Sequence, residues 1–363
     1  MSELTVVVQD HENVRARTQD GAEVSGYFQL NTLHRNVISV FEDWLRECKI
    51  SQRRELEALG ALLYTTIFTG QMETFFEQTL DRTLHAGHRL RLQLSFQKGA
   101  ADLASLPWEY LYRPETETAP GYFLSTAVNL VLSRYLPLVT GRRTLQPEES
   151  PLRILIVVAK PNGLGPVLEE QTVADIQELV ETYPIKVNIL ENPTVDNFLV
   201  ILEDARPHVV HFMGHGRFSQ TEGKGEIALL APDETSALWI GDREFTEFFV
   251  QMRSIPRLIV LHLCEGGSID FTANFAGLAP QLIRAGIQAV VAMQYRISNK
   301  AAIAFSRAFY RELASGEPVD NAVQSGRYRI TLSVPRAYDS RDFGTPVLYM
   351  HSRDGIIQPG RVT

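Results

Sequence analysis

The second half of the chain alternates short apolar runs with segments whose apolar residues recur every three or four positions. Apolar runs rich in β-branched residues predict buried strands, and the three-to-four spacing predicts amphipathic helices. Strands that alternate with helices are typical of a parallel sheet. We predict strands at 153–159, 185–190, 208–215, 257–264, 287–293 and 345–350, a small hairpin at 226–240, and helices at 169–182, 194–205, 241–252, 273–285 and, in two pieces, 298–331.

The first half of the chain has a different order of elements. Residues 90–96 alternate apolar and polar side chains, which predicts a strand with one face in water. Helical spacing dominates the region before this strand, and short β-like runs lie at the very beginning. We predict strands at 4–8, 24–30, 90–96 and 128–135, helices between about 34 and 87, and a helical turn at 107–112.

A proline-rich stretch separates the two patterns. Residues 137–151 contain three prolines, a glycine and several charged residues, a composition typical of a linker. We therefore predict an α+β accessory lobe at 1–140, a linker at 141–151 and a second domain at 152–363. The fold class expected for the second domain is α/β, with a mainly parallel central sheet between layers of helices.

Composition narrows the class of protein. The chain has 363 residues, 44% of them hydrophobic and 21% charged, as expected for a packed globular protein. Its net charge of −8 argues against a direct nucleic-acid partner, which needs a basic surface. No apolar stretch reaches 18 residues and the amino terminus lacks a signal-peptide pattern, so we expect no membrane partner and a cytoplasmic location.

The chain has two cysteines, Cys48 and Cys264, and neither belongs to a CxxC motif. A disulfide framework and a thiolate zinc site are therefore not expected. Four histidines lie near the predicted strand ends, but His208 points away from His211 and His215 because side chains alternate along a strand. We expect neither a metal nor a cofactor.

Two apolar runs end in residues that carry chemistry. The first reads HVVHFMGHG and contains His215, and the second reads RLIVLHLCEGG and contains Cys264, 49 residues later. In open α/β sheets the reactive groups gather at the carboxyl ends of the strands. A histidine followed by a cysteine at about this spacing is the caspase-type arrangement of base and thiol.

The two residues suit nucleophilic catalysis on a peptide carbonyl. A thiol attacks as the thiolate, and a neighbouring imidazole can accept its proton and later deliver that proton to the leaving amine. The backbone amides of Gly216 and Cys264 are the candidate donors to the oxyanion. Gly266 and Gly267 give the loop after Cys264 the freedom to present the sulfur.

Six segments together resemble the CHAT domain, a family of caspase-like cysteine proteases that includes relatives of separase. The resemblance covers roughly residues 90 to 350. The segments are LPWEYLY at 106–112, FMGHG at 212–216, LHLCEGG at 261–267, GLAPQLIRAG at 277–286, VVAMQYRIS at 290–298 and FSRAFYRELASG at 305–316.

The resemblance implies a caspase-like αβα sandwich with a degenerate, pseudo-caspase-like amino-terminal lobe. It implies His215 as general base, Cys264 as nucleophile and Gly216 as oxyanion donor. It also implies that Gln294, Tyr295 and Arg296 line the pocket for the residue before the scissile bond. Separase-like relatives carry Asp at the position of Arg296, so the reversed charge favours an acidic or neutral substrate residue here.

The resemblance also implies how the protein is used. We expect a protein substrate, and regulation by a sensor or other protein partner or by homo-oligomerisation, in a prokaryotic stress or antiviral defence pathway. Lys160, at the end of the first strand of the second domain, is a further candidate for binding an acidic substrate side chain.

Two other interpretations stay open. The chain could be a catalytically silent caspase-fold module that binds a partner, in which case Cys264 would show no selective reactivity. It could instead bind a nucleotide through the glycine-containing turn at 162–166, although GxGxxG is incomplete there and Pro166 lacks an amide hydrogen. We favour a plain loop at this position.

Overall fold

The structure of the protein is a computed structural model that describes residues 1–137, 151–167, 169–219, 221, 224–233, 235–265, 272–333, 337–352 and 354–357. The described residues form two compact units, one from Met1–Pro137 and Arg327–Val347 and the other from Leu138–Gly326 and Leu348–Thr363. Apart from Pro151, the predicted linker at 141–151 lies outside the described residues. The division at 1–140 and 152–363 stays a prediction.

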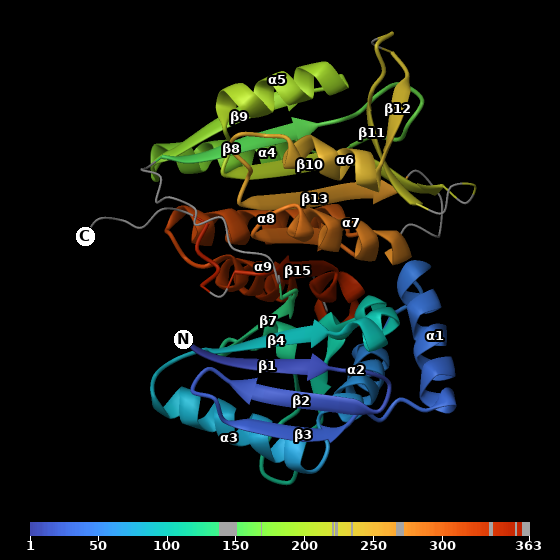
Figure 1. Ribbon diagram of the computed structural model, residues 1–363, viewed down its shortest axis with the longest axis vertical. Helices are drawn as coiled ribbons and strands as arrows, with labels where there is room; N and C mark the ends of the chain where they lie inside the picture. The colour runs from blue at the N-terminus through green and yellow to red at the C-terminus, as the bar shows by residue number, and fades with distance from the viewer. Residues whose placement is uncertain are drawn as a thin grey trace. The chain divides into compact units, whose positions relative to one another are not determined.

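The first unit combines a mixed sheet with helices (Figure 1). Its strands lie in the order β3-β2-β1-β4-β7, with β1 parallel to β4, β4 parallel to β7, and the other pairs antiparallel. Helix α3 packs against β2 and β3. The elements are β1 Ser2–Val8, β2 Asn13–Thr18, β3 Glu23–Tyr27, α1 Thr32–Arg46, α2 Arg53–Ile67, α3 Gln71–His85, β4 Leu90–Phe96 and β7 Leu130–Tyr135.

Two expectations about this sheet need correction. Strand β4 has the predicted bounds, but the predicted wet face is wrong because Arg91, Gln93 and Ser95 are buried along with the apolar face. Gln93 accepts a hydrogen bond from the hydroxyl of Thr5 on the adjacent β1, which partly satisfies the polar face. The sequence pattern also missed β2, whose buried Val14 and Ala16 lie between the two predicted strands.

Short helical turns and strands connect β4 to β7 and contribute buried aromatic residues to the core of this unit. Trp108 and Tyr110 are fully buried, and the Trp108 indole donates to the carbonyl of Leu103 at 2.8 Å. The Tyr110 hydroxyl donates to the carbonyl of Arg341 at 2.6 Å. The short elements between β4 and β7 are η1 Lys98–Ser105, η2 Trp108–Tyr110, β5 Tyr112–Arg113, β6 Tyr122–Phe123 and η3 Leu124–Thr126. Two more, η5 Ala337–Asp339 and η6 Arg341–Gly344, come from the late segment of this unit.

The second unit is built on five parallel strands in the order β9-β8-β10-β13-β14 (Figure 1). An antiparallel hairpin of β11 and β12 extends from the end of β10, as predicted. Its elements are β8 Leu152–Val158, α4 Glu170–Glu178, η4 Leu179–Glu181, β9 Ile185–Glu191, α5 Val195–Ala205, β10 Val209–Ser219, β11 Lys224–Leu230, β12 Ala237–Gly241, α6 Asp242–Val250, β13 Leu258–Glu265, α7 Thr272–Arg284, β14 Ala289–Met293 and α8 Asn299–Ala314. Two further elements, α9 Val319–Ser333 and β15 Pro346–Met350, each contain a boundary between the two units.

Helices cover both faces of this sheet, and alternation along β10 shows which residue meets which layer. Phe212 contacts Phe198 of α5 and Phe245 of α6, with ring centroids 6.5 and 5.8 Å apart. His211, one residue earlier, faces Tyr310 of α8 at 5.6 Å. The predicted α/β class with a mainly parallel central sheet between helical layers is therefore confirmed.

Candidate active site

Strands β10 and β13 bring the predicted base and nucleophile together. In their parallel register His215 lies directly opposite Cys264, and Gly216 lies opposite Glu265. Adjacent strands lie about 4.8 Å apart, so the backbones of the two residues are immediate neighbours. The glycines that follow, Gly266 and Gly267, lie outside the described residues.

Strand β10 pairs with β13 along one edge, and His215 lies where its partner along the other edge changes from β8 to β11. Strand β8 pairs with β10 as far as Met213, and β11 pairs with it from Gly216 onward. The predicted strand end beside His215 is therefore wrong, because the hairpin prolongs β10 to Ser219. Arg217 stabilises this extension: its guanidinium donates to Glu226 at 2.7 Å and stacks on Trp239 at 4.1 Å.

A cavity of about 340 Å³ opens beside His215. The face of β10 that points toward α8 supplies Met213 and His215, and β13 supplies His262. Only 2% of His215 is exposed, and neither of its ring nitrogens has a hydrogen-bond partner among the described residues. The remaining lining comes from two loops and a helix: Gly165, Pro166, Val167, Arg296, Ile297, Ser298, Asn299 and Ala302.

Two further histidines, His262 in the cavity lining and His211 behind it, lie on the same side of the sheet. The His262 ring is nearly parallel to that of His211, with centroids 6.1 Å apart. Burial lowers the pKa of His262 to about 4 and, together with the charge of His262, lowers the pKa of His211 well below its ordinary value. Both rings are therefore neutral at pH 7. Alternation along each strand puts His211 on the face of His215 and His262 on the face of Cys264, which agrees with this arrangement.

The start of α8 makes one wall of the cavity electropositive. Ser298 is the N-cap residue, and its side chain accepts a hydrogen bond from the amide of Ala301. The first turn of a helix carries a partial positive charge, and Arg296 adds a full one beside it. Among the described lining residues there is no carboxylate, so this cavity favours a negative or neutral group.

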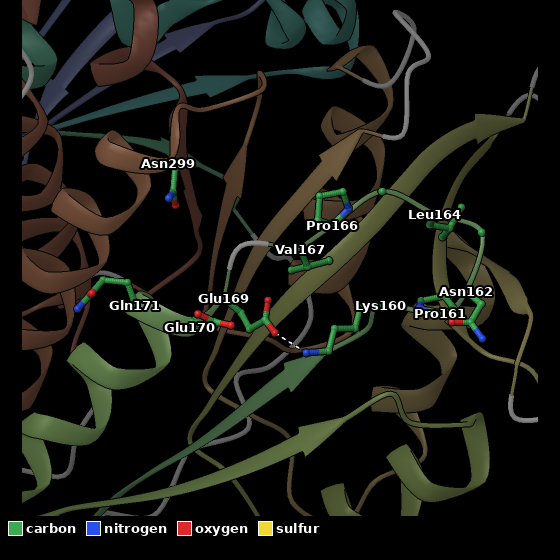
Figure 2. A pocket seen from close by; sticks show the side chains of 12 residues that line it. Lys160, Pro161, Asn162, Leu164, Pro166, Val167, Glu169, Glu170, Gln171 and Asn299 are labelled. Atoms are coloured by element: carbon green, nitrogen blue, oxygen red, sulfur yellow. Dashed lines mark hydrogen bonds and ion pairs between the residues drawn. The ribbon is translucent and has the colours of Figure 1, made fainter.

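A second cavity, of about 620 Å³, adjoins the first (Figure 2). The two share Gly165, Pro166, Val167 and Asn299 as lining. Its polar side chains come from the loop after β8 and from the start of α4. They include Lys160, Asn162, Glu169, Glu170 and Gln171.

Two of the four predicted substrate-pocket residues line a cavity, each a different one. Arg296 lines the cavity beside His215, whereas Gln294 and Tyr295 are not among the described lining residues of either cavity. Lys160 lines the second cavity, where its ammonium group is 2.5 Å from a Glu169 carboxylate oxygen (Figure 2). Gly216, a candidate oxyanion donor, lies inside β10 and is in register with both Glu265 and Ile227.

Sequence reasoning missed the acidic residues of the second cavity. Glu169 and Glu170 closely follow the glycine-containing turn, and this proximity was a usable signal. The helix start at Ser298 was predicted and is observed as the N-cap of α8, but its place at the cavity was not predicted.

Neither a metal centre nor a membrane span accompanies this site in the described part of the chain. Within the described ranges, no group of three or more His, Cys, Asp or Glu side chains is arranged to hold a metal ion. No helix among the same residues is long and apolar enough to cross a membrane.

Comparisons with known proteins point to one family. The family model of the CHAT domain matches residues 58–340. A comparison with curated proteins gives no match. Among solved structures, a chain of the Saccharomyces cerevisiae separase–securin complex is 13% identical with a TM-score of 0.39, over 72% of this chain and 15% of that one. The matched part of this chain thus spans about a seventh of the yeast chain. The Drosophila initiator caspase Dronc is 10% identical with a TM-score of 0.39, over 62% of this chain and 97% of Dronc.

Proposed function

The chain belongs to the CHAT domain family, and we propose that it is a cysteine endopeptidase with Cys264 as nucleophile and His215 as general base. The observation that carries this proposal is the register of β10 and β13, which sets His215 opposite Cys264 beside a cavity. The order of base and thiol along the chain is the one that caspase-type enzymes use.

The proposed reaction proceeds through an acyl-enzyme. His215 takes the thiol proton of Cys264, and the thiolate attacks the carbonyl carbon of the scissile peptide bond. The imidazolium then protonates the leaving amine, the C–N bond breaks, and a thioester remains. Water activated by the neutral His215 hydrolyses the thioester and regenerates the thiol.

Gly216 and Cys264 are the proposed backbone donors to the oxyanion. Donors of this kind act because they are already oriented toward the oxygen that gains charge in the transition state. For Gly216 the role requires an N–H that neither β11 nor β13 uses, since both strands are in register with it.

The residue before the scissile bond is proposed to be acidic or neutral. Arg296 and the first turn of α8 give one wall of the cavity beside His215 a positive charge. Gln294 and Tyr295 remain proposed pocket residues through their place in the same segment. Lys160 is a weaker candidate for an acidic side chain, because Glu169 already neutralises it.

The setting of this activity is proposed from the family resemblance. It comprises a cytoplasmic location, a specific protein substrate, and activation by a sensor or other protein partner or by self-assembly in a prokaryotic stress or defence pathway. A caspase-fold module without catalysis is the alternative function.

The test is cleavage of a diverse peptide library by the full chain and by two variants. We expect Cys264→Ala and His215→Ala each to lower cleavage by at least about a thousandfold, because the two residues act as a unit. Mass spectrometry of the products identifies the cleaved bonds and the residue that precedes each.

Thiol labelling distinguishes a latent enzyme from a silent module. The chain has two cysteines, so Cys48, which is exposed, is an internal reference for alkylation by iodoacetamide. Faster labelling of Cys264 than of Cys48, slowed in His215→Ala, supports an activated thiol even where no peptide is cut. No cleavage together with no selective labelling of Cys264 overturns the proposal in favour of the silent module.

A further inference from the structure

The second cavity has a charge opposite to that of the first. Its described lining holds three charged side chains, one ammonium group and two carboxylates. The Lys160 ammonium is 2.5 Å from a carboxylate oxygen of Glu169, and this hydrogen bond raises the pKa of Lys160. Lys160 therefore keeps its positive charge, which Glu169 offsets. Glu170 is left as the excess charge, and Glu191 adds to the negative potential at Lys160.

The geometry of the cavity leaves Glu170 available to a ligand. Glu170 is exposed at the first residue of α4, next to Glu169, whose side chain points to Lys160 (Figure 2). The glycine-containing loop also lines this cavity, and a Cβ at Gly163 or Gly165 would meet no atom within 4 Å. The loop therefore leaves open space beside the backbone, which an extended peptide can occupy.

The two cavities are close enough for one peptide to occupy both. They share three consecutive loop residues, Gly165 to Val167, which span at most about 10 Å. An extended peptide advances about 3.3 Å per residue, so it crosses this shared wall in about three residues. Side chains of one substrate can therefore reach both cavities.

We propose that the cavity lined by Glu169 and Glu170 is a substrate subsite for a lysine or arginine side chain. This inference rests on the proposed peptidase function, which sets the position of the basic residue relative to the cleaved bond. It narrows the class of substrate peptides. The substrate would carry an acidic or neutral residue beside Arg296 and a basic residue within about three positions of it. Opposite charges in neighbouring subsites also disfavour peptides with the two residues exchanged.

Peptide binding to the full chain with Cys264→Ala tests the subsite without requiring catalysis. The probes are eight-residue peptides with one fixed Asp, and with Lys, Arg, Ala or Glu at each of the three positions on either side. At one of these positions we expect Lys and Arg to bind about three- to fivefold more tightly than Ala, and Glu more weakly, as measured by fluorescence polarisation.

Charge changes at Glu170 then identify the cavity. In the Cys264→Ala background, Glu170→Gln should remove the preference for Lys and Arg, and Glu170→Lys should reverse it in favour of Glu. Glu178→Lys is the matched control, since it makes the same change at the far end of α4, outside both cavities, and should leave the order of binding unchanged.

The outcomes separate this subsite from the proposed activity. An unchanged order of binding in Glu170→Lys, or no preference for charge in the parent, overturns the subsite even if the wild-type chain cuts peptides. A reversed preference supports the subsite even if the wild-type chain cuts none. Enrichment of Lys or Arg at one position near the cleaved bonds of the library supports both.

Discussion

At the residue scale, the same kind of side chain takes different roles in this protein according to its surroundings. His215, His211 and His262 lie on one face of two adjacent strands, yet only His215 lies opposite Cys264. His211 and His262 are held neutral by burial, which suits packing between the sheet and α8 rather than proton transfer. All three are buried, so only the position of His215 opposite Cys264 distinguishes it from two histidines that the sequence presents as equivalent.

His262 gives a pH-dependent contribution to stability that can be measured. Burial holds its pKa at about 4, below the ordinary value of 6.5, so between these pH values the unfolded chain binds a proton that the folded chain does not. The free energy of unfolding should fall by about 2 kcal/mol between pH 7.5 and pH 5 on account of this side chain. Urea unfolding of wild type and His262→Gln at both pH values tests this, and an equal pH sensitivity in the two proteins would contradict it.

At the element scale, the close approach of short segments matters as much as the regular strands and helices. Helix α2 runs so near η2 and β5 that a Cβ at Gly60 would overlap the carbonyl oxygen of Tyr110 and lie 2.9 Å from the amide nitrogen of Tyr112. These are backbone atoms, which cannot rotate away as a side chain does. The segment LPWEYLY, one of those that resemble the CHAT family, is thus held against a helix through a glycine.

Gly60→Ala should therefore destabilise the protein although alanine is the better helix former. The overlap should cost more than the gain of about 1 kcal/mol in helix propensity, leaving a net loss of about 1–3 kcal/mol. The urea midpoint is the measurement. Thr65→Ala on the exposed side of the same helix is the control, expected to change stability little, and a Gly60→Ala protein as stable as wild type would refute the close approach.

At the scale of the whole molecule, buried charges explain why a late segment belongs with the amino-terminal unit. Arg327 is fully buried, donates to the carbonyls of Leu132 and Pro346, and lies 4.0 Å from Glu109. Arg134 donates to the same carboxylate at 3.0 Å. Burial lowers the pKa of Arg327 to about 10, which still leaves it charged at neutral pH. One carboxylate therefore serves two buried guanidinium groups from distant parts of the chain.

Removal of the Glu109 carboxylate charge should lower the stability of the folded protein. Glu109→Gln leaves two buried positive charges without this counterion, and we expect a loss of about 3–5 kcal/mol in the free energy of unfolding. The thermal and urea midpoints measure it, with the exposed Glu117→Gln as the matched control. A loss in Glu109→Gln no larger than in the control would mean that this cluster contributes little to folding.

Most of the local elements, and the resemblance to one family, could be predicted from the amino-acid sequence. Periodicity depends on neighbouring residues, so most helices and strands of both units could be predicted, including β4 and the hairpin of β11 and β12. The order of His215 and Cys264 at apolar runs, together with the surrounding segments, was enough to indicate the CHAT family. Alternation alone also indicated that His211 and His215 share one face of their strand.

The contacts between residues that are distant in the chain became known from the folded structure. The register of β10 and β13, the continuation of β10 past Gly216, the wall shared by two cavities and the pairing of Glu109 with Arg134 and Arg327 all join residues far apart in the chain. Such contacts depend on how strands align and helices pack, which the spacing of apolar residues within one segment does not specify. The sequence therefore indicated the chemistry of the candidate site, and the packing decided its walls and charges.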